Sequence, residues 1–164
     1  MDAELNPTAA APLPASSGGP ISTILFATDL SPASDRAFEE ARRLAREFHA
    51  ELVIAHAYDP SSVLALGYIP AHAYLQWEDE FRASLEQKLG PLVEAARRDG
   101  IEARAAVLSG HPEQAIIEAA ERERAGIILM GTHGRLGASR FFLGSVASRV
   151  IATAPCPVMT VRAQ

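Results

Sequence analysis

From residue 21 onward the sequence alternates short apolar runs with longer amphipathic segments, and this alternation limits the fold more than any other feature. The runs at 24–27, 52–55 and 127–130 are apolar at every position, which is typical of strands covered on both faces. In many of the segments between them, apolar residues recur every three or four positions, as on one face of a helix. Strands that alternate with helices predict a parallel sheet between two layers of helices.

Two further strands complete the predicted sheet. Residues 101–107 alternate apolar and more polar side chains, the pattern of a strand with one partly wet face at a sheet edge. The run 158–161 is the last apolar segment and is the second predicted edge strand. The chain is therefore predicted to form an α/β fold, a doubly wound open sheet of five parallel strands with four helices. These helices are expected to begin near residues 32, 74, 112 and 145.

Local signals indicate how some of these helices begin and bend. Ser31 is a preferred N-cap residue, and Pro32 suits the first helical position, where its missing N–H costs nothing. The long helix after residue 74 contains Gly90 and Pro91, which should kink it. An aromatic stripe on this helix is interpreted as core in preference to a ligand site; it comprises Tyr74, Trp77 and Phe81.

The 164 residues suit a single domain, which we place at residues 21–164. Residues 1–20 are rich in Ala, Pro, Ser and Gly, so ordering them would cost entropy with little burial in return, and we expect a flexible leader.

Asp2 and Glu4 stand where an export signal has basic residues, and no apolar run is long enough to cross a membrane. A lone cysteine, Cys156, suits a reducing compartment. We expect a soluble, cytoplasmic protein in which Cys156 is packed and not reactive.

The charge balance argues against nucleic acid as a partner. The chain has 15 Lys and Arg residues against 20 Asp and Glu, a net charge of −5, whereas binding to a phosphate backbone needs a cationic surface. Only 6% of the residues are aromatic, so a large platform for stacking bases is not expected either. The sequence predicts neither a nucleic-acid partner nor a membrane partner.

A glycine-rich span after residue 130 carries the strongest functional signal. Gly131 and Gly134 directly follow a predicted strand, and Gly144 and Ser145 stand where the next helix begins. Glycine lets backbone amides approach an anion closely, and a helix N-terminus adds positive charge. Open α/β sheets hold ligands at this end of their strands. We therefore predict a phosphate site in which Ser145 caps the helix and offers its hydroxyl to a phosphate or a hydrated metal ion.

Phosphate contacts alone are too weak to hold a nucleotide. A helix N-terminus contributes about 1 kcal/mol toward an anion, whereas micromolar affinity requires about 8 kcal/mol. The remainder must come from burying a base and a ribose, and the ends of the first two strands, at 27–29 and 56–57, are the predicted walls. Asp29 is either an acceptor for a ribose hydroxyl or base amino group, or a turn residue; His56 is interpreted as structural. A Walker loop is excluded because the only lysine, Lys88, lies far from the glycines.

The spacing of these residues resembles a known family. Gly131, two residues, Gly134, nine residues, then Gly144 and Ser145 is similar to the GxxG, nine, G(S/T) pattern of universal stress proteins of the ATP-binding, UspA-like branch. The resemblance covers about residues 20–162, including the opening and closing strands. It implies a Rossmann-like sheet, akin to the adenine-nucleotide alpha-hydrolase fold, with strand order 3-2-1-4-5.

The same resemblance implies a ligand and an assembly. ATP would have its ribose near Ala27 and Asp29 and its adenine at the backbone of Ala57, and Mg or Mn is the metal considered with the phosphates. Ala27 departs from the proline of some relatives, a change that a backbone contact tolerates. The implied binding set is Ala27, Thr28, Asp29, Ala57, Met130, Gly131, His133, Gly134, Arg135, Gly144, Ser145 and Val146. The closing strand implies a homodimer through Val158, Met159, Thr160 and Val161.

Three functions stay open at this point. The leading hypothesis is a stress-response ATP-binding module with at most slow ATP turnover, and we assign no catalytic residue. A phosphohydrolase or nucleotidyl-transfer enzyme would need basic or paired-histidine motifs that the sequence does not show. The third hypothesis is an interaction protein that works without nucleotide. His133 either touches phosphate or metal or is solvated, and Arg135 and Arg140 either neutralise phosphate or lie on the surface.

Overall fold

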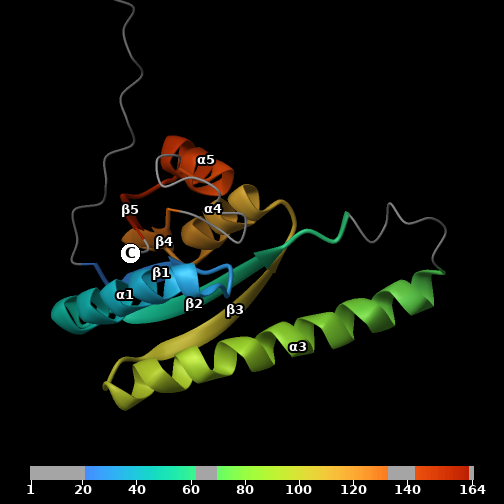
Figure 1. Ribbon diagram of the computed structural model, residues 1–164, viewed down its shortest axis with the longest axis horizontal. Helices are drawn as coiled ribbons and strands as arrows, with labels where there is room; N and C mark the ends of the chain where they lie inside the picture. Colours follow the sequence, from blue (N-terminus) through green and yellow to red (C-terminus); the bar gives the residue numbers. More distant parts are fainter. Residues whose placement is uncertain (1–20, 62–69, 133–142, 163–164) are drawn as a thin grey trace, which may run out of the picture.

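The computed structural model describes residues 21–61, 70–132 and 143–162, so the predicted leader at 1–20 lies outside the described residues. Within them, one parallel sheet has the order β3-β2-β1-β4-β5 (Figure 1). This confirms the predicted doubly wound five-stranded sheet and both predicted edge strands. The strands are β1 (Thr23–Ala27), β2 (Glu51–Tyr58), β3 (Ala103–Ser109), β4 (Ile127–Gly131) and β5 (Val158–Val161).

Helices cover both faces of this sheet (Figure 1). One face is covered by α1 (Asp35–Phe48) and α3 (Ala71–Arg98), and the other by α4 (Pro112–Arg122) and α5 (Ser145–Thr153). A short 3-10 helix, η1 (Pro32–Ser34), precedes α1. The four α-helices of the described residues agree with the prediction.

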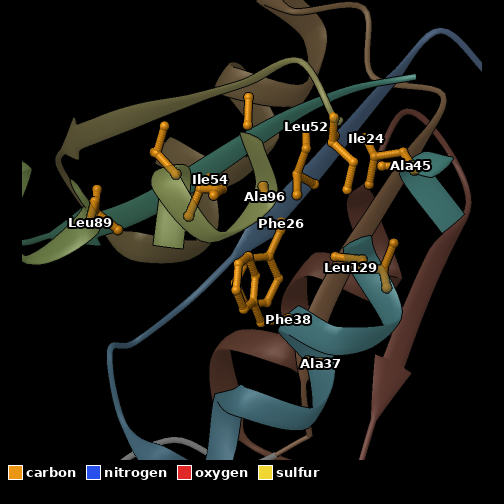
Figure 2. Close-up of a cluster of buried hydrophobic side chains, with 14 of the residues drawn as sticks. Ile24, Phe26, Ala37, Phe38, Ala45, Leu52, Ile54, Leu89, Ala96 and Leu129 are labelled. Carbon is orange, nitrogen blue, oxygen red and sulfur yellow. The ribbon is translucent and has the colours of Figure 1, made fainter. Parts of the chain in front are cut away.

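The core on the α1 and α3 face centres on Phe26 of β1 (Figure 2). Phe26 is fully buried, and its ring centroid lies 5.5 Å from that of Phe38 on α1. Leu52 of β2 and Leu89 of α3 are fully buried in the same cluster. Because alternate residues of a strand point to opposite faces, Leu25 belongs to the other cluster, beside α4 and α5. β1 therefore anchors both helical layers.

Two local predictions about the helices need correction or refinement. Ser31 occupies the N-cap of η1 with Pro32 after it, as predicted, but its side chain makes no capping bond, because the Ser31 hydroxyl donates to Asp29 instead. The long helix, α3, continues as one helix through Gly90 and Pro91. Any bend at Pro91 is therefore accommodated without ending the helix.

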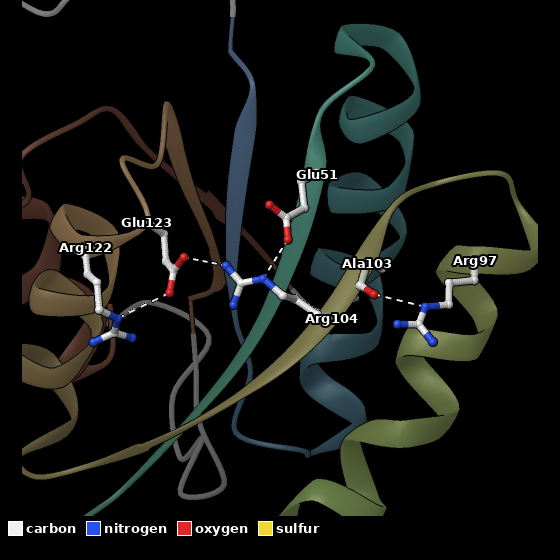
Figure 3. Close-up of polar contacts among 6 residues, drawn as sticks. All are labelled: Glu51, Arg97, Ala103, Arg104, Arg122 and Glu123. Carbon is white, nitrogen blue, oxygen red and sulfur yellow. Dashed lines mark hydrogen bonds and ion pairs between the residues drawn. The ribbon is translucent and has the colours of Figure 1, made fainter.

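An ionic network lies at the amino ends of β2 and β3 (Figure 3). Arg104 Nε donates to Glu51 Oε1 at 2.6 Å, and the guanidinium also donates to Glu123 at the end of α4. Arg122 pairs with Glu123 at 3.3 Å. Arg104 thereby ties two strands and one helix together at the end of the sheet opposite the predicted ligand edge.

Phe26→Ala is expected to lower the free energy of unfolding by about 3–5 kcal/mol, because it removes a fully buried ring and leaves a cavity at the centre of the core. The matched control is Phe48→Ala, since Phe48 is 44% exposed at the end of α1 and its truncation should cost less than about 1 kcal/mol. Urea denaturation measures both changes. Equal losses in the two variants would contradict the assignment of Phe26 to the centre of the core.

Glu123→Gln is expected to destabilise the protein at neutral pH. Burial raises the pKa of Glu123, but the hydrogen bond and charge of Arg104 outweigh it and hold the pKa below its ordinary value of 4.5. A carboxylate whose pKa is lowered by folding stabilises the protein above its unfolded pKa, and this contribution is lost as the pH falls through its folded pKa.

The difference in unfolding free energy between wild type and Glu123→Gln, measured by urea denaturation, should therefore be largest near pH 7 and shrink below about pH 4. Glu121→Gln on the exposed side of α4 is the control. A difference that stays constant over this range would show that the charge of Glu123 does not stabilise the fold.

Candidate functional site

The candidate site lies at the carboxyl edge of the sheet, where β1 ends between its neighbours β2 and β4. Ala27, the last residue of β1, pairs with Ala55 of β2 on one side and with Met130 of β4 on the other. Gly131 follows Met130 and pairs with Val161 of β5. The ends of the strands predicted to hold a nucleotide are therefore neighbours, at the switch point of the doubly wound sheet.

The chain leaves β1 through a tightly bonded turn. The Thr28 amide donates to the Ala55 carbonyl at 2.9 Å, and His56 Nδ1 lies 2.8 Å from the Thr28 carbonyl. Asp29 Oδ1 accepts from the Ser31 amide at 3.1 Å and from the Ser31 hydroxyl at 2.7 Å. Asp29 is thus a turn residue, and its half-buried carboxylate is also held in a fixed position at the edge. His56 has the structural role predicted for it.

One hydrogen bond joins the two ends of the glycine-rich span. The Gly144 amide donates to the Thr132 carbonyl at 2.8 Å, and the Thr132 amide donates to Val161 at 3.0 Å. Gly131 and Gly144 are therefore brought together beside β4 and β5. His133, Gly134, Arg135 and Arg140 lie outside the described residues.

The first turn of α5 lies at this junction, and its first backbone amides have no acceptor within the helix. Gly144 is the N-cap, so the prediction that Ser145 caps the helix is wrong: Ser145 is the first helical residue, and the cap position carries no side chain. The Ser148 amide makes the first helical bond, to the Gly144 carbonyl at 2.9 Å, which leaves the amides of Ser145 and Val146 without helical acceptors. Ala147 is buried against the sheet and holds the turn in place. A helix N-terminus of this kind favours an anion.

The remaining residues predicted for the site lie along the same edge. Ala57 is half-buried on β2, next to the buried His56. The Met130 side chain is buried, whereas Ser145 is exposed and its hydroxyl is open to solvent. In the part of the chain that the structure describes, no group of three or more His, Cys, Asp or Glu side chains could hold a metal ion.

Aromatic residues form a ladder on the first half of α3. Tyr58 at the end of β2 contacts Phe81 edge-on at 5.2 Å, Phe81 stacks on Trp77 at 5.2 Å, and Trp77 lies 5.9 Å from Tyr74. Phe81 packs against the core, while Trp77 and Tyr74 are half-buried. The interpretation of this stripe as core is therefore confirmed for Phe81. Trp77 and Tyr74, nearer the start of α3, are not part of the core cluster.

Cys156 is half-buried beside the α4 and α5 cluster. Burial raises the pKa of its thiol, more than the hydrogen bond with Ile128 lowers it. A raised pKa leaves little thiolate at neutral pH. The predicted packed and unreactive role agrees with this environment.

Together the fold and the edge define an α/β protein with two glycines and a helix N-terminus beside its central strands. The universal stress protein family model matches residues 20–162, and the chain belongs to that family. Universal stress protein MJ0531 of Methanocaldococcus jannaschii is 35% identical over 142 residues, covering 85% of this chain and 81% of the relative. A universal stress protein of Thermus aquaticus is 36% identical, covering 85% of this chain and 98% of the relative.

Solved structures share the fold. Protein MJ0577 of M. jannaschii superimposes with a TM-score of 0.79 at 22% identity, covering 89% of this chain and 99% of the other. A universal stress protein in complex with cAMP gives 0.65 at 24% identity, covering 89% and 100%. The universal stress protein of Archaeoglobus fulgidus in complex with dAMP gives 0.60 at 23%, covering 88% and 100%. Among the described residues, no helix is long and apolar enough to span a membrane.

Proposed function

We propose that this universal stress protein binds ATP at the carboxyl edge of its sheet and works as a dimeric, cytoplasmic nucleotide-binding module in a stress response. The observation that carries the proposal is the bond from the Gly144 amide to the Thr132 carbonyl, which sets two glycines and a helix N-terminus beside the end of β1. Two family structures in complex with adenine nucleotides, cAMP and dAMP, support this ligand class. The proposal assigns no dedicated catalytic group and allows at most slow turnover of ATP.

The phosphates are proposed to contact the α5 end of the edge. The amides of Ser145 and Val146 point toward an anion there, and the exposed Ser145 hydroxyl donates to a phosphate oxygen or to a water of an accompanying Mg or Mn ion. A side chain at Gly131 or Gly144 would occupy space that the phosphates need. The proposed site also includes His133, Gly134 and Arg135.

The nucleoside is proposed to lie over the ends of β1 and β2. Asp29 Oδ1 is held in place by the amide and hydroxyl of Ser31, and the carboxylate is proposed to accept a ribose hydroxyl. Ala27 and Met130 form an apolar floor, and the backbone of Ala57 lies at the position proposed for the adenine. Thr28 is bonded to two residues of β2: its amide donates to the Ala55 carbonyl, and its carbonyl contacts the His56 ring. These bonds keep this wall rigid.

The proposed dimer forms through the outer edge of β5. The Thr132 amide donates to Val161, and alternate residues of a parallel strand bond to the same neighbour. Met159 and Val161 therefore bond to β4, whereas the amides of Val158 and Thr160 point toward the opposite edge. No strand of the described residues covers that edge, and Met159 is 37% exposed beside it. A second copy would satisfy these amides.

Gly131→Val and Gly144→Val are each expected to weaken ATP binding at least about tenfold, because the added side chain enters the phosphate space while the fold remains. Isothermal titration calorimetry measures the affinity, and circular dichroism checks the fold. Gly90→Val is the control, because a Cβ there meets no atom within 4 Å and α3 lies away from the edge. ATP affinity equal to wild type in both edge variants would overturn the phosphate assignment.

Thr160→Pro is expected to convert the dimer to a folded monomer, because it removes an outward amide without touching the bonds between β5 and β4. Thr160→Val keeps the amide and should stay dimeric. Light scattering after size exclusion gives the mass. A Thr160→Pro protein that remains a dimer would show that the copies associate elsewhere.

The alternative functions are separated by whether nucleotide copurifies with the wild-type protein, read by mass spectrometry after denaturation. Recovered ATP supports the proposal. Rapid, metal-dependent multiple turnover would favour a phosphohydrolase or nucleotidyl-transfer enzyme. Absence of ATP from the purified protein, with no binding in calorimetry, would favour an interaction protein that does not use nucleotide.

A further inference from the structure

A cavity of about 180 Å³ lies between α1 and α3, under the turn that follows β1. We infer that this cavity is a second binding site, next to the carboxyl edge and sharing only Thr28 with the proposed nucleotide site, for a small zwitterion with an apolar side chain, of the size and chemistry of leucine. Its walls come from the α1 and α3 face of the sheet, where Phe26 and Phe38 pack, and not from α4, β4 or α5. The inference does not depend on ATP binding.

The inner wall of the cavity is apolar. Phe26 and Phe38 are buried in the core and line it from the sheet and from α1, while the half-buried Leu92 lines it from α3. An engineered, wholly apolar cavity of a similar size, about 150 Å³, holds benzene. The volume therefore suits a branched aliphatic side chain.

The polar floor offers acceptors and no spare donor. The Ser34 hydroxyl donates to the Ser31 carbonyl at 2.7 Å, so the proton in the 2.9 Å contact between Thr28 and Ser34 must come from Thr28. Thr28 Oγ1 also accepts from the Leu30 amide at 3.0 Å. Both hydroxyl protons are used, and lone pairs remain. A ligand at this floor must bring its own donor, as an ammonium group does.

Two opposite charges stand on facing helices at the cavity. Lys88 of α3 is the only lysine of the sequence, and Asp35 is the first residue of α1. Both are exposed, and neither forms an ion pair or side-chain hydrogen bond with another described residue. Lys88 supplies a cation for a carboxylate, while Asp35 and the floor accept from an ammonium. The complementary ligand carries both groups on one small apolar body.

The test uses three probes titrated into the full-length protein without nucleotide: leucine, leucinamide, which lacks the carboxylate, and N-acetylleucine, which lacks the ammonium. Ligand-observed NMR is expected to give a dissociation constant on the order of 1 mM for leucine. Each analogue should bind about fivefold more weakly, the effect of one partly exposed charge pair. The inference is overturned if leucine does not bind with a dissociation constant on the order of 1 mM. It is also overturned if all three probes bind equally.

Two variants locate the charges. Lys88→Gln should bring leucine down to the affinity of leucinamide, and Asp35→Asn should bring it down to that of N-acetylleucine. Arg98→Gln on α3 and Glu47→Gln on α1 remove exposed charges outside the cavity and serve as matched controls. Unchanged leucine affinity in the first two variants, or equal losses in the controls, would overturn the assignment.

A competition experiment separates this site from the carboxyl edge. Saturating ATP should leave leucine bound, because the cavity is lined from α1 and α3 and the proposed phosphate contacts lie on β4 and α5. Displacement of leucine by ATP would place both ligands in one site and overturn the inference. Retention of leucine by Gly131→Val is expected whether or not that variant binds ATP, so failure of the proposed function and failure of this inference remain distinguishable.

Discussion

The central position of β1 is the constraint on which the other features depend. β1 has hydrogen-bonded neighbours on both sides and helical layers over both faces, so its last residue, Ala27, cannot shift without moving the whole sheet. The segment after it inherits this rigidity because Thr28 is bonded to Ala55 and His56. The turn at Asp29 and the cavity beneath α3 both start from this fixed point. The positional accuracy that a binding site needs therefore comes from strand pairing, with the loop itself contributing little.

The sheet could be predicted because its strands carry a pattern that few other structures tolerate. A run such as 127–130, apolar at every position, suits a strand covered on both faces, and the alternating run at 101–107 belongs at an edge. The order of the strands came from family resemblance and not from pattern. Local hydrogen bonds were harder to predict. The Ser31 side chain is equally suited to cap a helix and to donate to Asp29. In the turn that forms, its hydroxyl donates to Asp29 and makes no capping bond.

The glycines of the candidate site could be predicted from the sequence, but the hydrogen bond that joins the two ends of the glycine-rich span could not. Gly131 and Gly144 were identified by spacing, but the bond that joins Gly144 to Thr132 spans a long stretch of chain and depends on where β4 and β5 end. The sequence showed that Lys88 is far from the glycines, but it gave no indication of which residues would lie near Lys88. Its place opposite Asp35 follows from the packing of α1 and α3 around Phe26, which no short-range pattern encodes.

The ionic network and the proposed ligand edge occupy opposite ends of the same strands. β2 runs from Glu51, bonded to Arg104, to Tyr58 near the edge, and at about 3.3 Å per residue this is a separation of about 23 Å. Groups this far apart that share no partner contribute to folding free energy almost additively. Descendants of this sequence can therefore adapt to heat or acid at one end of the sheet while ligand preference at the other end evolves on its own course.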